Sequence, residues 1–486
     1  MDLSSLFMSS ALVVLLALLL RIVYNLYLHP LSKFPGPWYA ASFSLPSAIL
    51  SVLDREPDWL LHVARKYGKG DLPIRIAPSL LLFPKPAALK DIYWDPKNNT
   101  KGGLYGTGAL AATHLFTILN GEEHRVLRKA LGGAQWGLGA VKTLSAKGEP
   151  INMADKLAQS AADVMTMVSF SEPWGFVGNS RDERQLIQSF REGLRFFGFA
   201  GRFRWFREVV LKSPLAPCFL PKMSDKKGNG YLALQADLQV REWEKMIKEF
   251  GYNNMQEYPD YLQHTLQARL PSGEPLSLAQ KRDHVTLLIQ GGADSTGTAL
   301  GSMIRFLLLN PICLSKARAE IVTADSAGLL SHPVKFEETR SRLPYFVACI
   351  KESLRLNPPG TSLYPRAAGK GGTIINGVYI PEGTEMTTNA IVVGRDKVLH
   401  APDPEAYRPE RWVEGEKRVA ELEAGSFVWG MGARACLGKD VAVMELYKLL
   451  PEVVRRFDME LVDEGRSAVA GGVAHNAGLM VGLTPV

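Results

Sequence analysis

The sequence predicts a mainly helical protein with a small β region behind an N-terminal apolar helix. A long helix begins at Ser277 with a capping box and ends near Leu309, before Asn310-Pro311. Residues 6–28 are apolar enough, and just long enough, for the ~20-residue helix that crosses a bilayer. Further helices are predicted at 59–66, 343–355 and 441–457. Strands at 72–76 and 79–83 are predicted to form a β-hairpin, and residues 377–384 a short β-turn-β unit.

Composition indicates a large folded core in a reduced compartment. The chain has 486 residues, of which 46% are hydrophobic and 22% are charged. Its net charge of +7 without long basic runs suits an acidic protein or an anionic membrane better than nucleic acid. The four cysteines are scattered without a Cys-x-x-Cys pair, so neither a zinc site nor a disulfide framework is predicted.

The N-terminal apolar run is predicted to be a membrane anchor. Arg21, His29 and Lys33 lie at its C-terminal side, which places the remainder of the chain in the cytosol. A cleaved signal peptide is the alternative, but no small-x-small cleavage site follows the run. Pro35-Gly36-Pro37 then breaks any helix. We expect an anchor at 1–30, a hinge at 31–40 and a catalytic domain at 41–486.

The most specific spacing is Gly430-x-Gly432-x-Arg434-x-Cys436-x-Gly438, directly before the helix at 441–457. In a glycine-rich loop at a helix N-terminus, a cysteine could accept backbone N–H bonds, and the helix dipole would favour its thiolate. A thiolate is a good axial ligand for haem iron. A buried structural cysteine is the alternative, but the spacing of the glycines and the arginine is difficult to explain that way.

This stretch resembles the haem-binding loop of the cytochromes P450, the haem-thiolate monooxygenases. Trp429 stands seven residues before the cysteine, where the family usually has phenylalanine, and it keeps a large ring there. The resemblance implies the cytochrome P450 fold and a haem b (iron protoporphyrin IX) whose iron is bound by Cys436. It also implies that Trp429, Gly430, Gly432 and Gly438 shape the cofactor loop.

The long helix contains a second candidate site around Gly291 and Gly292. Glycine inside a helix costs roughly 1 kcal/mol relative to alanine, which suggests close approach of a ligand. Asp294 and Ser295 could form an acid–hydroxyl pair that relays protons to dioxygen. A helix kinked for packing, with ordinary hydrogen bonds, is the alternative. The resemblance to the family's central helix implies catalytic roles for Asp294, Ser295 and Thr296, with Ser295 where threonine is usual.

Cationic side chains elsewhere suit the two haem propionates. His124 and Arg128 are four apart and share a helix face, which on its own could equally be a solvated basic face. The match to the family's propionate-binding helix, where tryptophan most often occupies the position of His124, favours the cofactor role. The resemblance adds Arg366 and Arg434 as further propionate donors.

Glu352 and Arg355 are three residues apart on a predicted helix and can form an ion pair. An isolated exposed pair contributes only about 0–1 kcal/mol. The resemblance to the family's Glu-x-x-Arg helix adds Arg411, from the segment Pro409-Glu-Arg-Trp412, as a third member. It implies a buried network that stabilises the fold rather than a catalytic group.

Residues 191–207 interleave arginines with aromatic residues. This pattern fits nucleic-acid stacking, insertion into a membrane interface or a structural helix face. The predicted anchor favours the interface, and the resemblance places these residues over the substrate pocket. Residues 105–119, Leu363 and Tyr364 are also expected at the pocket, and residues 470–480 are expected to form its last loop.

No Gly-x-Gly-x-x-Gly follows a strand, so no dinucleotide site is predicted and electrons must come from another protein. The resemblance implies NADPH as the indirect donor through an NADPH–cytochrome P450 reductase at the endoplasmic reticulum membrane. We expect the reductase to dock on a basic face at Lys129, Arg434 and Lys439. The expected substrate is a lipophilic small molecule.

The hinge and the C-terminal third look most like fungal microsomal members, including the pisatin demethylase-like group. Many such enzymes act in secondary-metabolite biosynthesis on terpenoids, polyketides or peptides. Detoxification of a xenobiotic or phytoalexin is the first alternative. A P450-fold isomerase or dehydratase and a non-catalytic haem-binding protein are further alternatives. The presence of both Asp294 and Ser295 argues against them, because such proteins usually lack this acid–hydroxyl pair.

Overall fold

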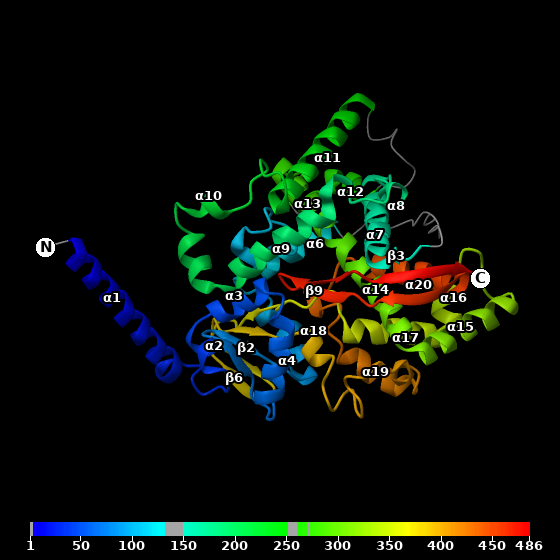
Figure 1. Cartoon of the computed structure of the whole chain (residues 1–486). Helices are drawn as coiled ribbons and strands as arrows, with labels where there is room; N and C mark the ends of the chain where they lie inside the picture. Colours follow the sequence, from blue (N-terminus) through cyan, green and yellow to red (C-terminus); the bar gives the residue numbers. More distant parts are fainter. Residues whose placement is uncertain (1–2, 132–148, 251–259, 271) are drawn as a thin grey trace.

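The computed structural model describes residues 3–131, 149–250, 260–270 and 272–486. Figure 1 shows a broad helical body that contains several small sheets, with α1 projecting away from it. The mainly helical class with a small β region is therefore confirmed. The helices are α1 (Leu3–Val23), α2 (Trp38–Ser42), α3 (Leu45–Val52), α4 (Glu56–Tyr67), α5 (Leu89–Tyr93), α6 (Gly121–Leu131), α7 (Met153–Phe170), α8 (Phe176–Asn179), α9 (Leu186–Arg202), α10 (Ala216–Phe219), α11 (Gly228–Phe250), α12 (Tyr261–Gln267), α13 (Leu278–Gly291), α14 (Ala293–Leu309), α15 (Pro311–Ser326), α16 (Phe336–Arg342), α17 (Pro344–Leu356), α18 (Ala390–Val393), α19 (Glu416–Ala424) and α20 (Lys439–Arg456).

The strands form small, separate sheets. The largest has the order β1-β2-β7-β4, in which β1 and β2 make the predicted hairpin and β2 pairs with β7 in parallel. A second sheet has the order β3-β11-β8, and β9–β10 and β5–β6 are two-stranded. The strands are β1 (Ile74–Ala77), β2 (Leu80–Leu82), β3 (Ile151–Asn152), β4 (Arg366–Ala367), β5 (Thr373–Ile375), β6 (Val378–Ile380), β7 (Glu385–Thr387), β8 (Phe457–Asp463), β9 (Arg466–Ala470), β10 (Val473–Ala477) and β11 (Met480–Pro485).

Two local predictions about strands were wrong. Residues 377–384 were expected to form one β-turn-β unit, but β6 pairs with β5, and β7 belongs to the largest sheet. Residues 470–480 were expected to be a loop, yet most of them form β10 and the turn from β9. The Gly471-Gly472 pair supplies that turn, with φ of 56° and 92°.

The helix that begins at the predicted Ser277 capping box divides at Gly292 into α13 and α14. Its end at Asn310 is as predicted. The buried residues of α14 pack against α7 and against a core shared with α15, α17 and α20. The divided helix thus crosses the middle of the protein and places residues 290–296 inside it.

The segment after α1 belongs to the folded body. A π-helical turn, η1 (Tyr24–Leu28), continues α1, and α2 begins at Trp38 within the expected hinge. Leu31 and Phe34 are buried in one hydrophobic cluster with residues of β2 and α5. The proline-rich segment therefore packs against the body rather than spanning a gap.

Candidate active site

The loop before α20 is closed by backbone geometry that requires glycine. Gly430 and Gly432 have φ of 66° and 70°, a region that L side chains rarely adopt. A Cβ at Gly432 would lie 2.1 Å from the carbonyl oxygen of Tyr93. The N–H of Cys436 donates to the carbonyl oxygen of Trp429 at 2.8 Å, which fixes the thiol directly before the first turn of α20.

The pKa of the Cys436 thiol is shifted in the opposite direction to the one expected from the sequence. Cys436 has accessible surface, but most of the volume around its thiol is protein, and this desolvation raises its pKa. Hydrogen bonds from the backbone N–H groups of Gly438 and Lys439, and the charge of Arg128, act in the opposite direction but do not outweigh it. The expectation that the loop alone favours a thiolate was therefore wrong.

Arg128 and Arg434 support this loop from two directions. Nη1 of Arg128 donates to the carbonyl oxygens of Ala433 and Ala435 at 3.2 and 2.9 Å. Nη1 of Arg434 donates to the carbonyl oxygen of Ile118 at 3.0 Å, and its Nη2 donates to three further carbonyl oxygens, those of residues 99, 119 and 120. Neither guanidinium forms an ion pair within the parts of the chain that the structure describes.

Arg366 and His124 lie beside these two arginines. Arg366 is buried with its guanidinium 5.0 Å from the ring centre of Tyr93. His124 is also buried, and its pKa falls to about 3, first because of burial and then because of the charges of Arg434, Lys101, Arg128 and Arg366. The structure therefore brings all four predicted donors into one electrostatic environment, with His124 uncharged at neutral pH.

Lys101 is a fifth member that the sequence did not reveal. Its Nζ donates to the carbonyl oxygens of Leu115 and Phe116 at 3.2 and 2.5 Å and lies 4.5 Å from the ring centre of Tyr105. Burial, followed by the charges of Arg434, Arg366 and Arg128, holds its pKa well below the usual value. A lone lysine in an irregular segment carries no pattern that would distinguish it from a surface residue.

Lys101, Arg128, Arg366 and Arg434, together with the uncharged His124, are called the cationic cluster below. Within the described residues, none of them lies within ion-pair distance of a carboxylate. Buried positive groups without counter-charges are costly unless a ligand supplies negative charge. A haem carries two negatively charged propionates and would meet this requirement, so the residues present fit the cofactor.

The two glycines of the divided helix have different environments. A Cβ at Gly292 would lie 2.4 Å from Cγ of Met165, so this glycine permits close packing against α7. A Cβ at Gly291 would have no atom within 4 Å, and Gly291 is exposed. Only Gly291 therefore keeps the open surface that a ligand at this helix would need.

The structure does not join the expected acid and hydroxyl. Oγ of Ser295 donates to the carbonyl oxygen of Gly291 at 2.8 Å, across the division of the helix. Asp294 is only 2% exposed and accepts a bidentate ion pair from Arg191 of α9, with Nη2 to Oδ1 at 2.6 Å and Nε to Oδ2 at 3.1 Å. Thr296 is buried. In the described chain, no hydrogen bond links Asp294 to Ser295.

The glutamate–arginine network is complete. Oε1 and Oε2 of Glu352 accept from Nη2 and Nε of Arg355 at 2.7 and 2.8 Å, and Oε1 also accepts from Nε of Arg411 at 3.0 Å. Nε1 of Trp412 and the backbone N–H of Arg408 add bonds of 2.9 Å each. All three charged side chains are at most 3% exposed. The network fastens α17 to the segment that precedes the Cys436 loop.

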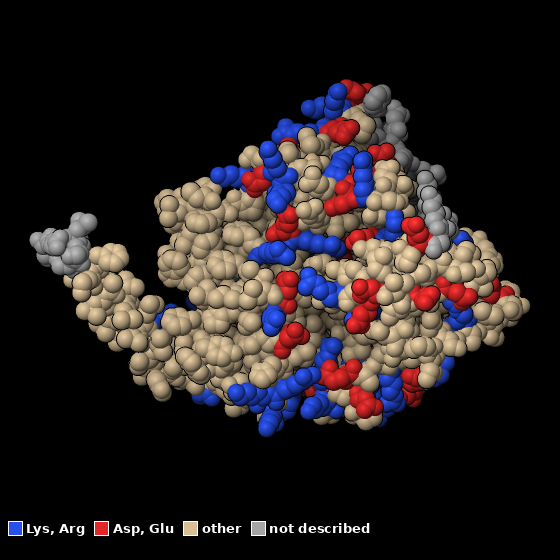
Figure 2. Space-filling view, in the orientation of Figure 1, with Lys and Arg blue, Asp and Glu red and all other residues tan. Residues whose placement is uncertain are grey.

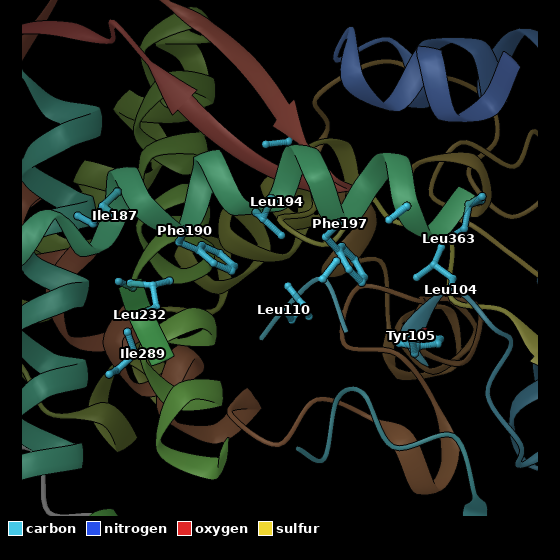
Figure 3. Close-up of a cluster of buried hydrophobic side chains, with 14 of the residues drawn as sticks. Leu104, Tyr105, Leu110, Ile187, Phe190, Leu194, Phe197, Leu232, Ile289 and Leu363 are labelled. Atoms are coloured by element: carbon cyan, nitrogen blue, oxygen red, sulfur yellow. The ribbon is translucent and has the colours of Figure 1, made fainter. Parts of the chain in front are cut away.

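Helix α9 covers an apolar space in front of the divided helix. Figure 3 shows Phe190, Leu194 and Phe197 of α9 on the side that faces Leu110 and Tyr105. These residues belong to one buried cluster with Leu104, Ile289 and Leu363. Leu363 thus lies in this cluster, which would give the expected pocket an apolar wall.

Arginines of residues 191–207 hold α9 in place instead of facing a membrane. Arg202 is 1% exposed and pairs with Glu56 of α4 through two contacts of 2.5 Å. Arg207 is also buried and pairs with Glu208. Together with the Arg191–Asp294 pair near the other end of α9, this shows that the interfacial interpretation was wrong for these three arginines. Trp205 is the aromatic residue in this range that is strongly exposed.

Comparison with known proteins settles the family. The sequence model of the family described as Cytochrome P450 matches residues 134–469, which is more than half of the chain. The chain belongs to the cytochrome P450 family. Its mainly helical fold agrees with this family, and the protein is a cytochrome P450 monooxygenase.

Relatives of this cytochrome P450 are fungal enzymes that match along nearly their whole length. Cytochrome P450 monooxygenase gsfF of Penicillium aethiopicum is 27% identical, covering 92% of this chain and 91% of the relative. Quiannulatic acid synthase of Emericella variicolor is 26% identical, with 87% and 86% covered. Cytochrome P450 monooxygenase aba1 of Botryotinia fuckeliana is 26% identical, with 94% and 92% covered.

For this cytochrome P450, we predict that Lys101→Met weakens haem retention. One charge-assisted hydrogen bond contributes about 1.5–3 kcal/mol, which corresponds to roughly a ten- to hundredfold loss of haem affinity. The measurement is transfer of haem to an excess of apomyoglobin, followed by absorbance. Lys101→Arg should restore most of the affinity. Exposed Lys97 provides a matched control, and an equal loss in Lys97→Met would contradict the assignment.

We also predict that Arg191→Gln changes proton delivery more than binding. The substitution leaves the buried Asp294 charge unpaired, at a cost of about 1.5–3 kcal/mol. The ratio of product to NADPH consumed should fall, and the solvent isotope effect on product formation should rise. Arg195, exposed one turn further along α9, is the control. Unchanged coupling in a folded Arg191→Gln enzyme would show that Asp294 has only a packing role.

Proposed function

We propose that the protein inserts one oxygen atom of dioxygen into a lipophilic small molecule, with electrons from NADPH. The balanced reaction converts substrate, O₂, NADPH and a proton into hydroxylated product, NADP⁺ and water. The observation that carries the proposal is the uncompensated cationic cluster beside the Cys436 loop. A purely structural loop would not need five buried or half-buried basic groups without a carboxylate among the described residues.

Different residues of the chain would have different roles in such a reaction. Cys436 would bind the iron of haem b, and the cationic cluster would hold its propionates. When bound, the haem supplies the oxidising power for oxygen insertion. Ser295, whose hydroxyl lies at the open Gly291, would hold a proton at Oγ on the oxygen side. Asp294 could act as the acid of this pair after separation from Arg191.

An apolar substrate fits the residues that surround the expected pocket. The cluster beneath α9 consists of aliphatic and aromatic side chains such as Phe190, Leu194 and Leu363. We propose a role in fungal secondary-metabolite biosynthesis within the pisatin demethylase-like group, since the fungal relatives include a synthase and several monooxygenases. Detoxification would require the same pocket chemistry and is the second candidate.

Electrons would arrive from an NADPH–cytochrome P450 reductase at the face where α6 meets the Cys436 loop. Lys129 and Lys439 are exposed there, one on α6 and one at the first turn of α20. Arg434 was also expected on this face, but its guanidinium is directed inward to backbone carbonyls. The proposed docking face therefore rests on the two lysines.

Charge reversal at Lys129 and Lys439 should slow reduction by the reductase. At low ionic strength we expect the association rate of the double Glu variant to fall by about tenfold, because steering of the acidic partner is lost. Added salt should reduce the difference in association rate between this variant and the wild-type enzyme. Stopped-flow reduction under carbon monoxide measures the rate. Equal rates at every salt concentration would place the docking face elsewhere.

We propose that α1 anchors the enzyme in the endoplasmic reticulum membrane with the catalytic domain in the cytosol. The candidate span Phe7–Leu28 has a mean hydropathy of 2.3, and its most apolar part is not buried against the rest of the protein. A cleaved signal sequence would share this hydropathy. Docking of η1 against the body, however, is expected of a segment that remains attached.

The function is tested by comparing metabolites of a deletion strain with those of its parent. A precursor that accumulates in the deletion strain is then supplied to the purified enzyme with reductase and NADPH. We expect one oxygen atom from ¹⁸O₂ in the product. Conversion without NADPH or oxygen would instead identify an isomerase or dehydratase. Binding without any turnover would identify a non-catalytic haem protein.

A further inference from the structure

Arg75 on β1 is a buried cation that holds the end of the apolar helix. It is 1% exposed, and no carboxylate pairs with it in the described chain. Its Nη1 donates to the carbonyl oxygen of Asn25 at 2.6 Å, and its Nε and Nη2 donate to that of Pro78 at 3.2 and 2.7 Å. Burial lowers its pKa to about 10, so the guanidinium remains charged at neutral pH.

Further hydrogen bonds and close contacts join the segments around Arg75. The side chain of Asn25 is 1% exposed and donates from Nδ2 to the carbonyl oxygen of Ser42, at the end of α2, at 2.8 Å. The N–H of Arg75 donates to the carbonyl oxygen of Pro35 at 2.7 Å. A Cβ at Gly36 would lie 2.2 Å from the carbonyl oxygen of Arg75. We call residues 24–42 together with Arg75 the neck joint.

An exposed apolar surface lies on the side of the body from which α1 projects. Figure 2 shows few charges there, and Figure 1 places α3 and α10 on that side. The exposed side chains include Trp38, Ile49 and Leu53 from α2–α3, and Trp205, Leu215 and Phe219 from residues 205–219. Such a surface marks a protein or membrane contact. Its continuity with the apolar α1 favours the membrane.

Positive charges lie around the neck joint. The pKa of His29 is lowered to about 4, first by burial and then by the charges of Arg75, Arg21 and Arg204. Arg21 and Arg204 are exposed and come from opposite sides of the joint, one from α1 and one from the segment after α9. Cations at this level suit the anionic headgroups of a lipid bilayer.

We propose that Arg75 couples α1 rigidly to the catalytic domain, so that the apolar surface of α2–α3 and residues 205–219 enters the bilayer together with α1. The partner is a phospholipid membrane with anionic headgroups. The proposal rests on membrane anchoring by α1. It adds that the neck joint, rather than the apolar surface alone, determines how deeply the domain is inserted.

Cys218 on α10 provides a reporter within this surface, because it is exposed, whereas Cys313 and Cys349 are buried. The other exposed cysteine, Cys436, would be bound to haem iron in the loaded enzyme. The full-length haem-loaded enzyme is labelled there with an environment-sensitive fluorophore and reconstituted into phosphatidylcholine–phosphatidylserine vesicles. Lipids brominated in the acyl chain should quench the wild-type label. The Cys218→Ser enzyme, treated in the same way, measures labelling elsewhere.

Two variants test the coupling. Arg75→Met removes the hydrogen bonds but keeps an apolar stem. A Gly-Ser-Gly insertion between Val23 and Tyr24, where α1 passes into η1, frees α1 from the joint and leaves the bond from Arg75 to Asn25 in place. Arg65→Met is the control, because its ion pair with Glu405 is exposed. We expect both test variants to float with the vesicles and to lose quenching, while the control retains it.

The outcomes separate anchoring from coupling. Failure of the wild-type enzyme to float would refute anchoring by α1. Flotation without quenching of the wild-type label would refute the membrane surface. Full quenching in the insertion variant would overturn rigid coupling. If Arg75→Met does not retain haem, the insertion variant alone decides the result.

Discussion

Exchange of Cys436 for serine should abolish oxidation while leaving the folded chain intact. A serine hydroxyl cannot replace the thiolate as a strong electron donor to haem iron, so loss of NADPH-dependent product should be complete within detection. The absorption band of the reduced carbon monoxide complex, which reports thiolate ligation, should disappear. Circular dichroism should be unchanged. Cys218→Ser, at an exposed cysteine on α10, is the matched control.

The raised pKa of the Cys436 thiol adds a pH dependence to this prediction. Ligation requires the thiolate, so haem binding releases the thiol proton. Haem affinity of the wild-type loop should therefore increase with pH until the thiol ionises by itself. The Cys436→Ser variant should lack this dependence. A wild-type affinity that does not vary between neutral and alkaline pH would contradict a protonated thiol in the unliganded loop.

The second large effect is expected at Glu352. Glu352→Gln keeps the shape of the side chain but leaves Arg355 and Arg411 buried without a negative partner. Removal of one member of a buried ion pair costs about 3–5 kcal/mol, and loss of haem should follow because the network supports the segment before the Cys436 loop. Thermal unfolding of the holoenzyme measures the effect. Glu423→Gln, at an exposed pair with Lys351, should change stability by at most about 1 kcal/mol.

Acidic pH should destabilise the wild-type protein in the same way as the Glu352→Gln substitution, because both remove the negative charge of Glu352. Burial by itself raises the pKa of Glu352, but hydrogen bonds from Arg355 and the charges of Arg355 and Arg411 outweigh it, so its pKa in the folded protein is lowered. The stabilisation is therefore present above the pKa of the unfolded chain, about 4.5, and is lost as pH falls through the lower folded value. The Gln variant should lose this part of the acid dependence. An identical acid profile in both proteins would exclude Glu352 as the titrating group.

Features formed by neighbours in sequence could be predicted from the sequence. The Cys436 loop is defined by residues within nine positions, and its positive φ values explain the glycines at 430 and 432. Glu352 and Arg355 form an i,i+3 pair, and the capping box at Ser277 is local as well. These interactions depend on backbone geometry that a short pattern specifies.

Features formed across the fold could not be predicted in this way. Arg191 and Asp294 are 103 residues apart, and no local pattern distinguishes Arg191 from its exposed neighbour Arg195. Lys101 became part of the cationic cluster because an irregular segment placed it beside Tyr105 and Phe116. The interleaved arginines and aromatics from Arg191 onwards looked amphipathic, but the carboxylates that pair with Arg191 and Arg202 lie on other helices.

The two ion pairs that hold α9 have a consequence for the kinetics of ligand uptake. Arg191 and Arg202 lie towards opposite ends of the helix that covers the apolar cluster, and each must leave a carboxylate before that helix can lift. A large ligand would therefore wait for a conformational step whose rate does not depend on its own concentration. Selectivity in this enzyme would then arise partly from the time for which the covering helix stays open, and not only from the shape of the space beneath it.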